Sequence, residues 1–193
     1  MLLMDKFYYD FNTLINENHL IFDHQERVGK IVHLLSRHLS FDAPTCDKYK
    51  LCASFHDVGK MKTPHHILYK PGKLTVDEYT EMKLHVNHGY DMMNEYVSID
   101  FKPIFTNIIL YHHENFDGTG YVANLKGREI PLESRLTMIC DVYHALRERR
   151  SYKAALDHGE ALQIMNRMKF KFDYEIFYEF MQIPEKFFDK IVG

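Results

Sequence analysis

Apolar residues recur at intervals of three and four residues along most of this chain, and this spacing is the strongest constraint on its fold. Such a period is that of an α-helix with one apolar face. The clearest run follows a candidate N-cap at Asp23 and consists of Val28, Ile31, Val32, Leu35 and Leu39. Further runs continue to the C-terminal residues. The pattern therefore predicts an all-α protein, a single helical bundle.

Turn signals separate the remaining helical runs. We expect helices over about 49–59, 75–96, 103–113 and 136–146, with two or three more in 157–193. The first of these would carry His56 and Asp57 in its last turn. The second opens on Thr75 and Glu78, the signature of a capping box. The loop over 115–130 contains Asp-Gly and Lys-Gly turns and is a candidate for one short β-hairpin.

Length and composition bound the class of protein. A chain of 193 residues suits one domain over 1–193, with its motifs within about 23–153 and the helices of 157–193 packed on that part. The formal net charge of −3 gives no reason to expect binding to a DNA or RNA duplex. No stretch approaches the roughly 18 apolar residues of a membrane span, and no signal peptide is evident. With three cysteines and no CxxC pair, we expect a cytoplasmic protein.

Histidine and aspartate residues of the types that bind metals occur in several of the predicted helices and in the turns that follow them. His112 and His113 are adjacent and precede a loop with two glycines, Asp117-Gly118-Thr119-Gly120, which allow a sharp turn. A His-His pair alone is weak evidence, because surface and hydrogen-bonded histidines are common. Asp141 stands among apolar neighbours, where a buried charge must be paired or bind a metal. The full candidate set is His24, His56, Asp57, His85, His112, His113 and Asp141.

These residue types suit iron, manganese or zinc in a site that is open to a substrate, because none of them is a thiolate. Neighbours on a helix point about 100° apart. His56 and Asp57 therefore cannot easily bind one ion from one side, whereas Asp57 could bridge two ions. His85, His112 and His113 would complete one metal site, and His24, His56 and Asp141 the other. Two such ions are typical of in-line displacement at phosphorus.

Lys60 follows the His-Asp pair and Gly59, where a helix is expected to end. By position alone, a solvated lysine in a C-cap is the more common reading. Beside two metal ions, however, an ammonium group would stabilise charge that develops on a phosphoryl oxygen. We therefore assign Lys60 and Asp57 as the catalytic residues.

The segment His56-Asp57-Val58-Gly59-Lys60 resembles the HDxGK signature of the HD phosphohydrolase superfamily. The residues from Ile67 to Gly72, the segment from His112 to Tyr121, Ile130-Pro131, Arg135 and Asp141-Val142 resemble its HD-GYP subfamily. The resemblance covers about Asp23 to Lys153. It implies an all-α fold, a dinuclear or trinuclear iron or manganese centre, and hydrolysis of cyclic di-GMP.

Matched by position, the resemblance places the family's metal ligands on the seven residues of the candidate set. It places the phosphate-contacting lysine on Lys60. Gly120 and Tyr121 belong to the Gly-Tyr signature of the substrate loop, and Arg150 and Lys153 match positions that approach the nucleotide. Three positions depart from the family pattern, namely Leu20, Val122 and His144.

Each departure has a consequence. Leu20 stands where trinuclear members carry a glutamate, which favours two metal ions. Val122 replaces the proline of the signature, so the loop is less rigid. His144 stands where an aspartate lies near the guanine edge, and a neutral imidazole cannot accept both guanine donors. We expect His144 to face the substrate cleft beside Asp141 and to weaken the preference for guanine.

Two functions follow from these features. The first is a metal-dependent phosphodiesterase that opens a cyclic dinucleotide, cyclic di-GMP foremost, by attack of a metal-bridging hydroxide, giving a linear dinucleotide or GMP. The second is a nucleotide-binding signalling module without turnover, or a phosphohydrolase for another nucleotide. The presence of all seven ligands favours the enzyme. A separate sensory or diguanylate cyclase partner would regulate it, and the oligomeric state is left open.

Overall fold

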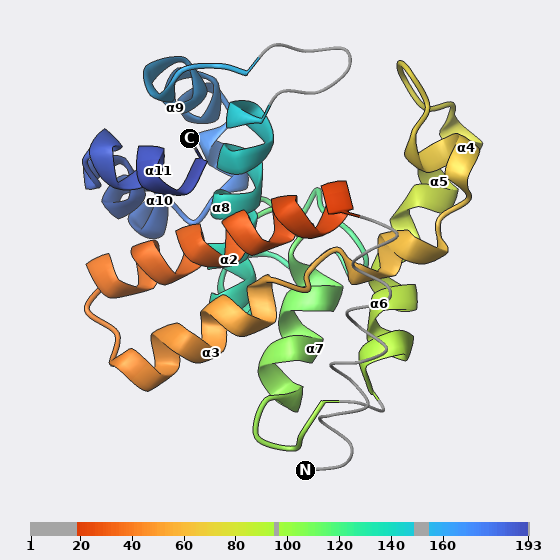
Figure 1. Cartoon of the computed structure of the whole chain (residues 1–193), viewed down its shortest axis with the longest axis horizontal. Helices are drawn as coiled ribbons and strands as arrows, with labels where there is room; N and C mark the ends of the chain where they lie inside the picture. Colours follow the sequence, from red (N-terminus) through yellow and green to blue (C-terminus); the bar gives the residue numbers. More distant parts are fainter. Residues whose placement is uncertain (1–18, 95–96, 149–154, 193) are drawn as a thin grey trace.

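The computed structural model describes residues 19–94, 97–148 and 155–192. These residues form α-helices, short 3-10 helices and turns, and none of them lies in a β-strand, which confirms the all-α prediction (Figure 1). No helix in these ranges is long and apolar enough to cross a membrane.

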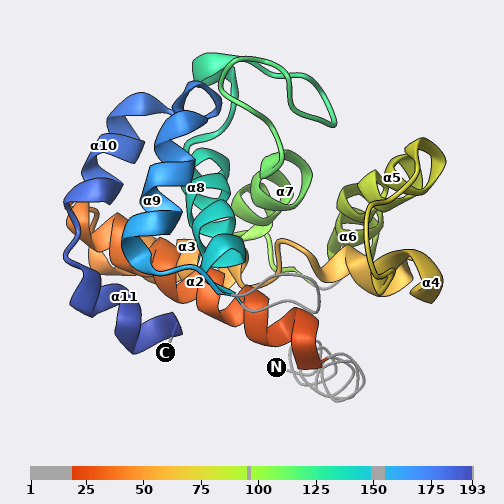
Figure 2. The ribbon, with the colours of Figure 1, turned by 90° about the horizontal axis from the view of Figure 1, so that it is seen from above.

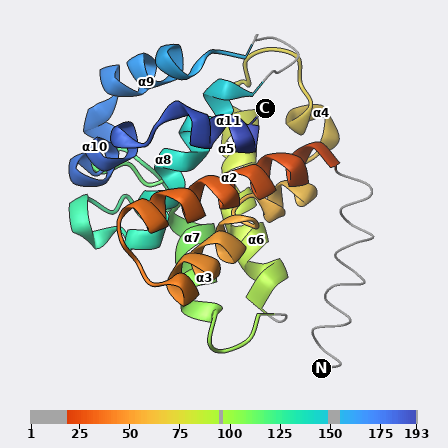
Figure 3. The same ribbon diagram turned by 60° about the vertical axis from the view of Figure 1, so that its left-hand side comes forward.

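The longest helix, α2 (His19–His38), crosses the middle of the molecule (Figures 1 and 3). It packs along α3 (Ala43–Ala53) on one side and against α8 (Leu132–Arg147) on another. α7 (Lys102–Tyr111) packs against α3, α8 and α6 (His85–Asn94). α2, α6, α7 and α8 therefore meet in one region, which lies at the start of α6, at the end of α7 and along the length of α8.

Shorter elements connect and flank this group. They are η1 (Val58–Lys62), α4 (His65–Leu68), α5 (Val76–Lys83), η2 (Gly127–Glu129), α9 (His158–Arg167), η3 (Lys169–Lys171), α10 (Tyr174–Gln182) and α11 (Glu185–Val192). Figure 2 shows that α9, α10 and α11 lie on the side of the bundle away from α4 and α5.

The core is one apolar cluster that includes the C-terminal helices. Val28, Ile31 and Leu35 of α2 are fully buried, as their spacing predicts. Phe177 and Phe188 of α10 and α11 are buried in the same cluster. The helices after residue 157 thus contribute side chains to the same core as α2. Burial of these side chains stabilises the fold by roughly 1.5–3 kcal/mol each.

Three helix boundaries differ from expectation. α2 begins before Asp23, which is an exposed residue inside the helix and not its N-cap. A single exposed aspartate costs a helix little, so it does not have to mark an end. α3 ends at Ala53, so His56 and Asp57 lie in the turn that leads to η1. The expected helix over 75–96 is interrupted at Leu84, although its capping box at Thr75 is confirmed.

The expected β-hairpin in 115–130 is wrong. The backbone amides of this segment donate hydrogen bonds to side chains and to other backbone carbonyls, and do not form a ladder between two strands. The amide of Ala123 donates to Glu114 Oε1 at 2.6 Å, and the amide of Phe116 donates to the carbonyl of Lys171 at 2.8 Å. Thr119 donates to Asp117 in a local turn. The loop is therefore held by side chains and by a segment from the C-terminal half.

A contact between two glycines sets the distance between η1 and α6. A Cβ added to Gly59 would lie 1.9 Å from the carbonyl oxygen of His85 and 2.4 Å from the amide of Gly89. No other residue fits there, because real Cβ atoms do not approach backbone atoms so closely. This approach brings Asp57, two residues before Gly59, up to His85 at the start of α6.

Candidate metal centre

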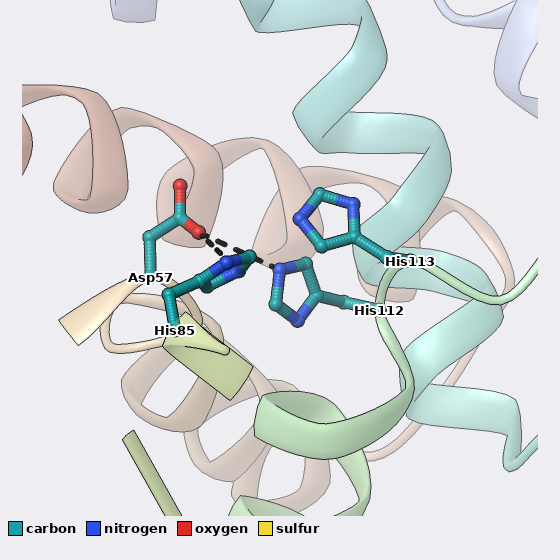
Figure 4. A group of neighbouring side chains, drawn as sticks. All are labelled: Asp57, His85, His112 and His113. Carbon is teal, nitrogen blue, oxygen red and sulfur yellow. Dashed lines mark ion pairs between the residues drawn. The ribbon is translucent and has the colours of Figure 1, made fainter. Parts of the chain in front are cut away.

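All seven predicted ligands gather where α2, α6, α7 and α8 converge. His24 comes from α2, His56 and Asp57 from the turn after α3, His85 from α6, and Asp141 from α8. His112 and His113 follow α7. Figure 4 shows Asp57, His85, His112 and His113 directed at one another. Except for His113 and Asp141, which are partly buried, all of these residues are buried.

The ligands form two groups that meet at Asp57. In one group, Asp57 Oδ1 lies 3.1 Å from His85 Nε2 and 3.6 Å from His112 Nε2, with His113 alongside. Its other oxygen, Oδ2, lies 3.4 Å from His56 Nε2.

The second group consists of His24, His56 and Asp141. His24 Nε2 lies 2.9 Å from Asp141 Oδ1, and His56 Nε2 lies 3.7 Å from the same oxygen. Within each group the ligand atoms lie within 4.8 Å of one another. Asp57 is thus placed to contribute one oxygen to each group, as a bridging carboxylate does.

Backbone carbonyls fix the orientation of three imidazoles. Nδ1 of His56, His85 and His112 lies 2.8, 2.7 and 2.8 Å from the carbonyls of Ala53, Met82 and Ile108, respectively. A carbonyl only accepts, so each Nδ1 carries the hydrogen and each Nε2 faces the cluster. This is the usual way in which a metal-binding histidine is held.

The atoms at the centre of the cluster have no hydrogen-bond partner among the described residues. They are Asp57 Oδ1 and the Nε2 atoms of His56, His85 and His112. A carboxylate oxygen and a neutral Nε2 are both acceptors, so their approach is repulsive unless a cation lies between them. The donor set of imidazole and carboxylate suits a divalent metal. The residues therefore fit a metal centre.

The mutual effects of these groups on their pKa values agree with this arrangement. Burial raises the pKa of Asp57, but the opposite effect of Lys60 and His56 is larger and holds this pKa well below its usual range. Burial lowers the pKa of His56, but Asp57 and Asp141 raise it to about 10, so without a metal a proton takes the place of the cation. Burial and nearby histidines lower the pKa of His113 well below the usual range. Its Nε2 or Nδ1 is therefore available as a ligand at neutral pH.

Lys60 lies on the other side of Asp57. Its Nζ donates to Asp57 Oδ2, the oxygen that faces His56, and its side chain is partly buried. The 3-10 helix η1 turns tightly enough to bring the two side chains together across three residues. The ammonium group is therefore next to the candidate centre.

Tyr121 covers the open side of His113. The two rings stack with centroids 4.8 Å apart, and Lys83 of α5 lies 5.3 Å above the Tyr121 ring. Gly120 makes this possible, because a Cβ there would lie 2.3 Å from the amide of Asn115. Val122, which follows, is exposed. Tyr121 of the loop and Lys83 of α5 thus place an aromatic ring and a positive charge beside the cluster.

A family model described as "HD domain" matches residues 11–176. The chain belongs to the HD-domain family. It is 41% identical over 140 residues to a cyclic di-GMP phosphodiesterase of Vibrio cholerae, covering 70% of this chain and 28% of that protein. It is 33% identical over 159 residues to a cyclic di-GMP phosphodiesterase of Pseudomonas aeruginosa, covering 82% and 38%.

A third relative is a 3'3'-cGAMP-specific phosphodiesterase of Vibrio cholerae, 37% identical over 130 residues, covering 67% of this HD-domain chain and 25% of that protein. The chain thus spans 25% to 38% of the length of these three relatives. The fold also matches a solved cyclic GMP-AMP-specific phosphodiesterase of Vibrio cholerae. The TM-score is 0.65 at 18% identity, covering 88% of this chain and 46% of that one.

An HDGYP protein of Bdellovibrio bacteriovorus has the same fold, with a TM-score of 0.65 at 18% identity, covering 83% of this chain and 51% of that one. At such identities the likeness concerns the fold alone.

His144 of this HD-domain chain is not where we expected it. It is fully buried, and its Nδ1 lies 2.8 Å from Nδ1 of His24. Asp141 and His144, three residues apart, do lie on the same face of α8, as predicted. That face is covered by α2, however, so the placement does not support a contact between His144 and a nucleotide base. Arg150 and Lys153 lie outside the described residues, as does the side chain of Leu20.

Two residues near this HD-domain centre carried no signal in the sequence. Gln25 is fully buried, and its Oε1 accepts a hydrogen bond from the amide of Asp57 at 3.0 Å. Glu148 Oε2 lies 3.6 Å from His24 Nδ1. Both contacts join residues that are far apart in the chain, so only the packing of the helices reveals them.

Proposed function

We propose that this HD-domain chain is a metal-dependent phosphodiesterase that hydrolyses a cyclic dinucleotide, cyclic di-GMP foremost, to a linear dinucleotide or GMP. The observation that carries the proposal is the set of lone pairs that face one another at Asp57, His85 and His112. Only a cation reconciles them. The names of the relatives, cyclic di-GMP and 3'3'-cGAMP phosphodiesterases, supply the substrate class.

Two divalent ions, iron or manganese, would supply Lewis acidity and a water nucleophile that is activated at neutral pH. His85, His112, His113 and Asp57 Oδ1 would hold one of them. The other would be held by His24, His56, Asp141 and Asp57 Oδ2. The mixture of oxygen and imidazole ligands supports iron or manganese over a structural zinc site, which would use thiolates.

The chain's own residues then have separate tasks. Lys60 donates a hydrogen bond to the phosphoryl oxygen on which negative charge develops. Tyr121 and Lys83 form a wall beside His113 against which a base and its phosphate can be placed. Burial of His56, His85 and His112 keeps bulk water away from one side of the centre, which strengthens each of these electrostatic effects.

A mixed adenine–guanine cyclic dinucleotide is a second candidate substrate, because one relative with 37% identity is named for 3'3'-cGAMP. Parallel assays on cyclic di-GMP and on the mixed dinucleotide distinguish the two candidate substrates.

We further propose that the protein acts in the cytoplasm. Its three cysteines are buried and unpaired, which suits a reducing compartment. A separate sensory or diguanylate cyclase partner stays a prediction.

Purification without oxygen, followed by metal analysis and assay against a panel of cyclic and linear dinucleotides, tests the proposed function. We expect about two ions per chain and hydrolysis of cyclic di-GMP that a chelator abolishes and that iron or manganese restores. Metal without turnover on any dinucleotide would support the alternative of a nucleotide-binding module.

A further inference from the structure

His24 is held differently from His56, His85 and His112. His56, His85 and His112 each donate Nδ1–H to a carbonyl of their own segment. The Nδ1 of His24 instead meets another side chain, Nδ1 of His144, at 2.8 Å across 120 residues of sequence. The two rings are tilted by 58° with centroids 4.8 Å apart. His24 is the ligand whose orientation depends on a side chain from another helix.

α8 carries both His144, which makes this contact, and Asp141, which is a candidate metal ligand. Asp141, His144 and Glu148 follow one another at intervals of three and four residues, so they lie along one stripe of the helix or just past its end at Arg147. Asp141 Oδ1 lies 2.9 Å from His24 Nε2. Glu148 Oε2 lies 3.6 Å from His24 Nδ1. Side chains from the same face of α8 therefore contact both ring nitrogens of His24.

The chemistry of imidazole then defines the role of His144. A metal at Nε2 of His24 needs the lone pair of that nitrogen, so the single proton of the neutral ring must be on Nδ1. A proton on a buried Nδ1 needs an acceptor, and His144 Nδ1 is at hydrogen-bond distance from it. We propose that His144, supported by the nearby Glu148, is a positioning residue that holds His24 in the tautomer and orientation that bind the metal.

This inference rests on the proposed metal centre and goes beyond it, because His144 contacts neither the metal nor the substrate. A neutral histidine that accepts at Nδ1 carries its own proton on Nε2, and that atom has no partner among the described residues. The acceptor role therefore leaves one buried N–H unpaired, an arrangement that a purely structural role does not require.

A third cation is the competing account of the same residues. His24, His144 and Glu148 offer three ligand atoms within 4.8 Å of one another. His24 would then have to bind two ions at once through both nitrogens, with no proton left on the ring. Tautomer control needs no such deprotonation, and the Nδ1–Nδ1 distance of 2.8 Å is a hydrogen-bond distance. The number of bound ions separates the two accounts.

Two substitutions of nearly equal shape isolate the acceptor. In His144→Asn, Oδ1 occupies the place of the histidine Nδ1 and still accepts the proton from His24. In His144→Leu, a methyl group occupies that place and accepts nothing. His33→Leu is the control for loss of a histidine on α2, since His33 is half-exposed and pairs with Asp47.

The wild type and the three variants are stripped with a chelator and titrated with Mn²⁺ without oxygen, the free ion being followed by electron paramagnetic resonance. We expect two ions per wild-type chain. In His144→Leu one ion should bind about 10- to 100-fold more weakly, as after loss of other groups that orient a ligand. His144→Asn and His33→Leu should bind within about threefold of the wild type, a margin that reflects ordinary context effects.

The unfolding temperature of the metal-free proteins distinguishes positioning from a general packing role. His144→Leu removes the unpaired buried N–H of His144 but also takes the acceptor from the Nδ1 of His24, so these two effects oppose each other and its metal-free form should unfold close to the wild-type temperature. A weaker metal site in an equally stable protein supports the inference. Equal Mn²⁺ affinity in His144→Leu and the wild type would overturn it, as would three ions in the wild type and two in His144→Leu. A wild type that binds no metal would overturn the proposed function as well.

Discussion

Oδ1 of Asp57 lies 3.1 Å from Nε2 of His85, and neither atom has a hydrogen-bond partner among the described residues. The Nδ1–H of His85 is used by the carbonyl of Met82, so its Nε2 is an acceptor like the carboxylate oxygen. Two buried acceptors at this distance are stable only with a cation between them. The arrangement of the whole centre follows from this pair, because the second oxygen of Asp57 faces His56 in the same way.

Asp57→Ala should abolish both metal binding and hydrolysis, because Asp57 is the one side chain that faces both groups of ligands. Metal analysis after dialysis and an assay on cyclic di-GMP measure the two effects. Asp47→Ala, which removes an exposed carboxylate beside His33, is the control and should change neither. Two tightly bound ions in Asp57→Ala would show that Asp57 does not bridge them.

Lys60→Ala should keep both metals and lose rate. The Nζ of Lys60 contacts Asp57 Oδ2 but is no metal ligand, so its removal takes away stabilisation of charge in the transition state. The loss of kcat should be roughly 10²- to 10³-fold, as for one preorganised donor. Lys62→Ala, an exposed lysine two residues further on, should be close to wild type. Release of metal from Lys60→Ala would contradict the role given to it.

Tyr121→Ala should weaken metal retention and raise KM, whereas Tyr121→Phe should do little to either. The ring of Tyr121 stacks on His113 at 4.8 Å and lies under Lys83. An aromatic contact of this kind is worth about 0.5–1.5 kcal/mol, or roughly two- to tenfold in affinity. Mn²⁺ titration and steady-state kinetics of both variants measure it. Equal behaviour of the alanine and phenylalanine variants would show that the ring has no such role.

The metal-free protein should lose stability as pH rises above neutrality. Burial lowers the pKa of His56, but Asp57 and Asp141 raise it to about 10 in the folded chain, against an ordinary value near 6.5 when unfolded. A group with a raised pKa contributes stability that is complete below the unfolded value and is lost as pH rises through the folded one.

Thermal unfolding of the metal-free protein between pH 6.5 and about 10 checks this expectation. The unfolding temperature should fall across this range, and the fall should be smaller in His56→Gln, which cannot be protonated. Neighbouring His24 also has a raised pKa, because Asp141 and Glu148 outweigh the effect of its burial, so some of the fall should remain in the variant. An identical pH profile for the variant and the wild type would contradict the assignment to His56.

His144→Asp should leave the ratio of kcat/KM for cyclic di-GMP and a mixed adenine–guanine cyclic dinucleotide unchanged. Its side chain is buried behind His24, so it is not placed to read a base. This replaces the expectation from sequence that His144 faces the substrate cleft and weakens the preference for guanine. A shift of tenfold or more, about 1.4 kcal/mol, would show that the first expectation was right.

The sequence was sufficient to single out the residues that gather at the candidate metal centre, because metal binding restricts the residue type and these residues lie in recognisable motifs. His56 and Asp57 are one example, and His112 and His113 are another. It was also sufficient for the helices, whose apolar faces follow a period. Helix ends were harder to predict, since an exposed aspartate such as Asp23 is tolerated inside a helix as well as at its start.

The remaining errors concern contacts between distant segments. The amide of Phe116 pairs with Lys171 in place of a hairpin partner, and His144 turns to His24 on another helix. Periodicity gives the face of α8 on which His144 lies but not what covers that face. Gln25 was missed for the same reason, since its partner is the amide of Asp57.

A crystal structure of the protein purified without oxygen, with anomalous diffraction measured at the iron and manganese edges, tests the central claim most directly. We predict two ions, one bound by Asp57 Oδ1 with His85, His112 and His113, and the other by Asp57 Oδ2 with the remaining ligands. A single ion, or a third one bound by His24, His144 and Glu148, would contradict the account.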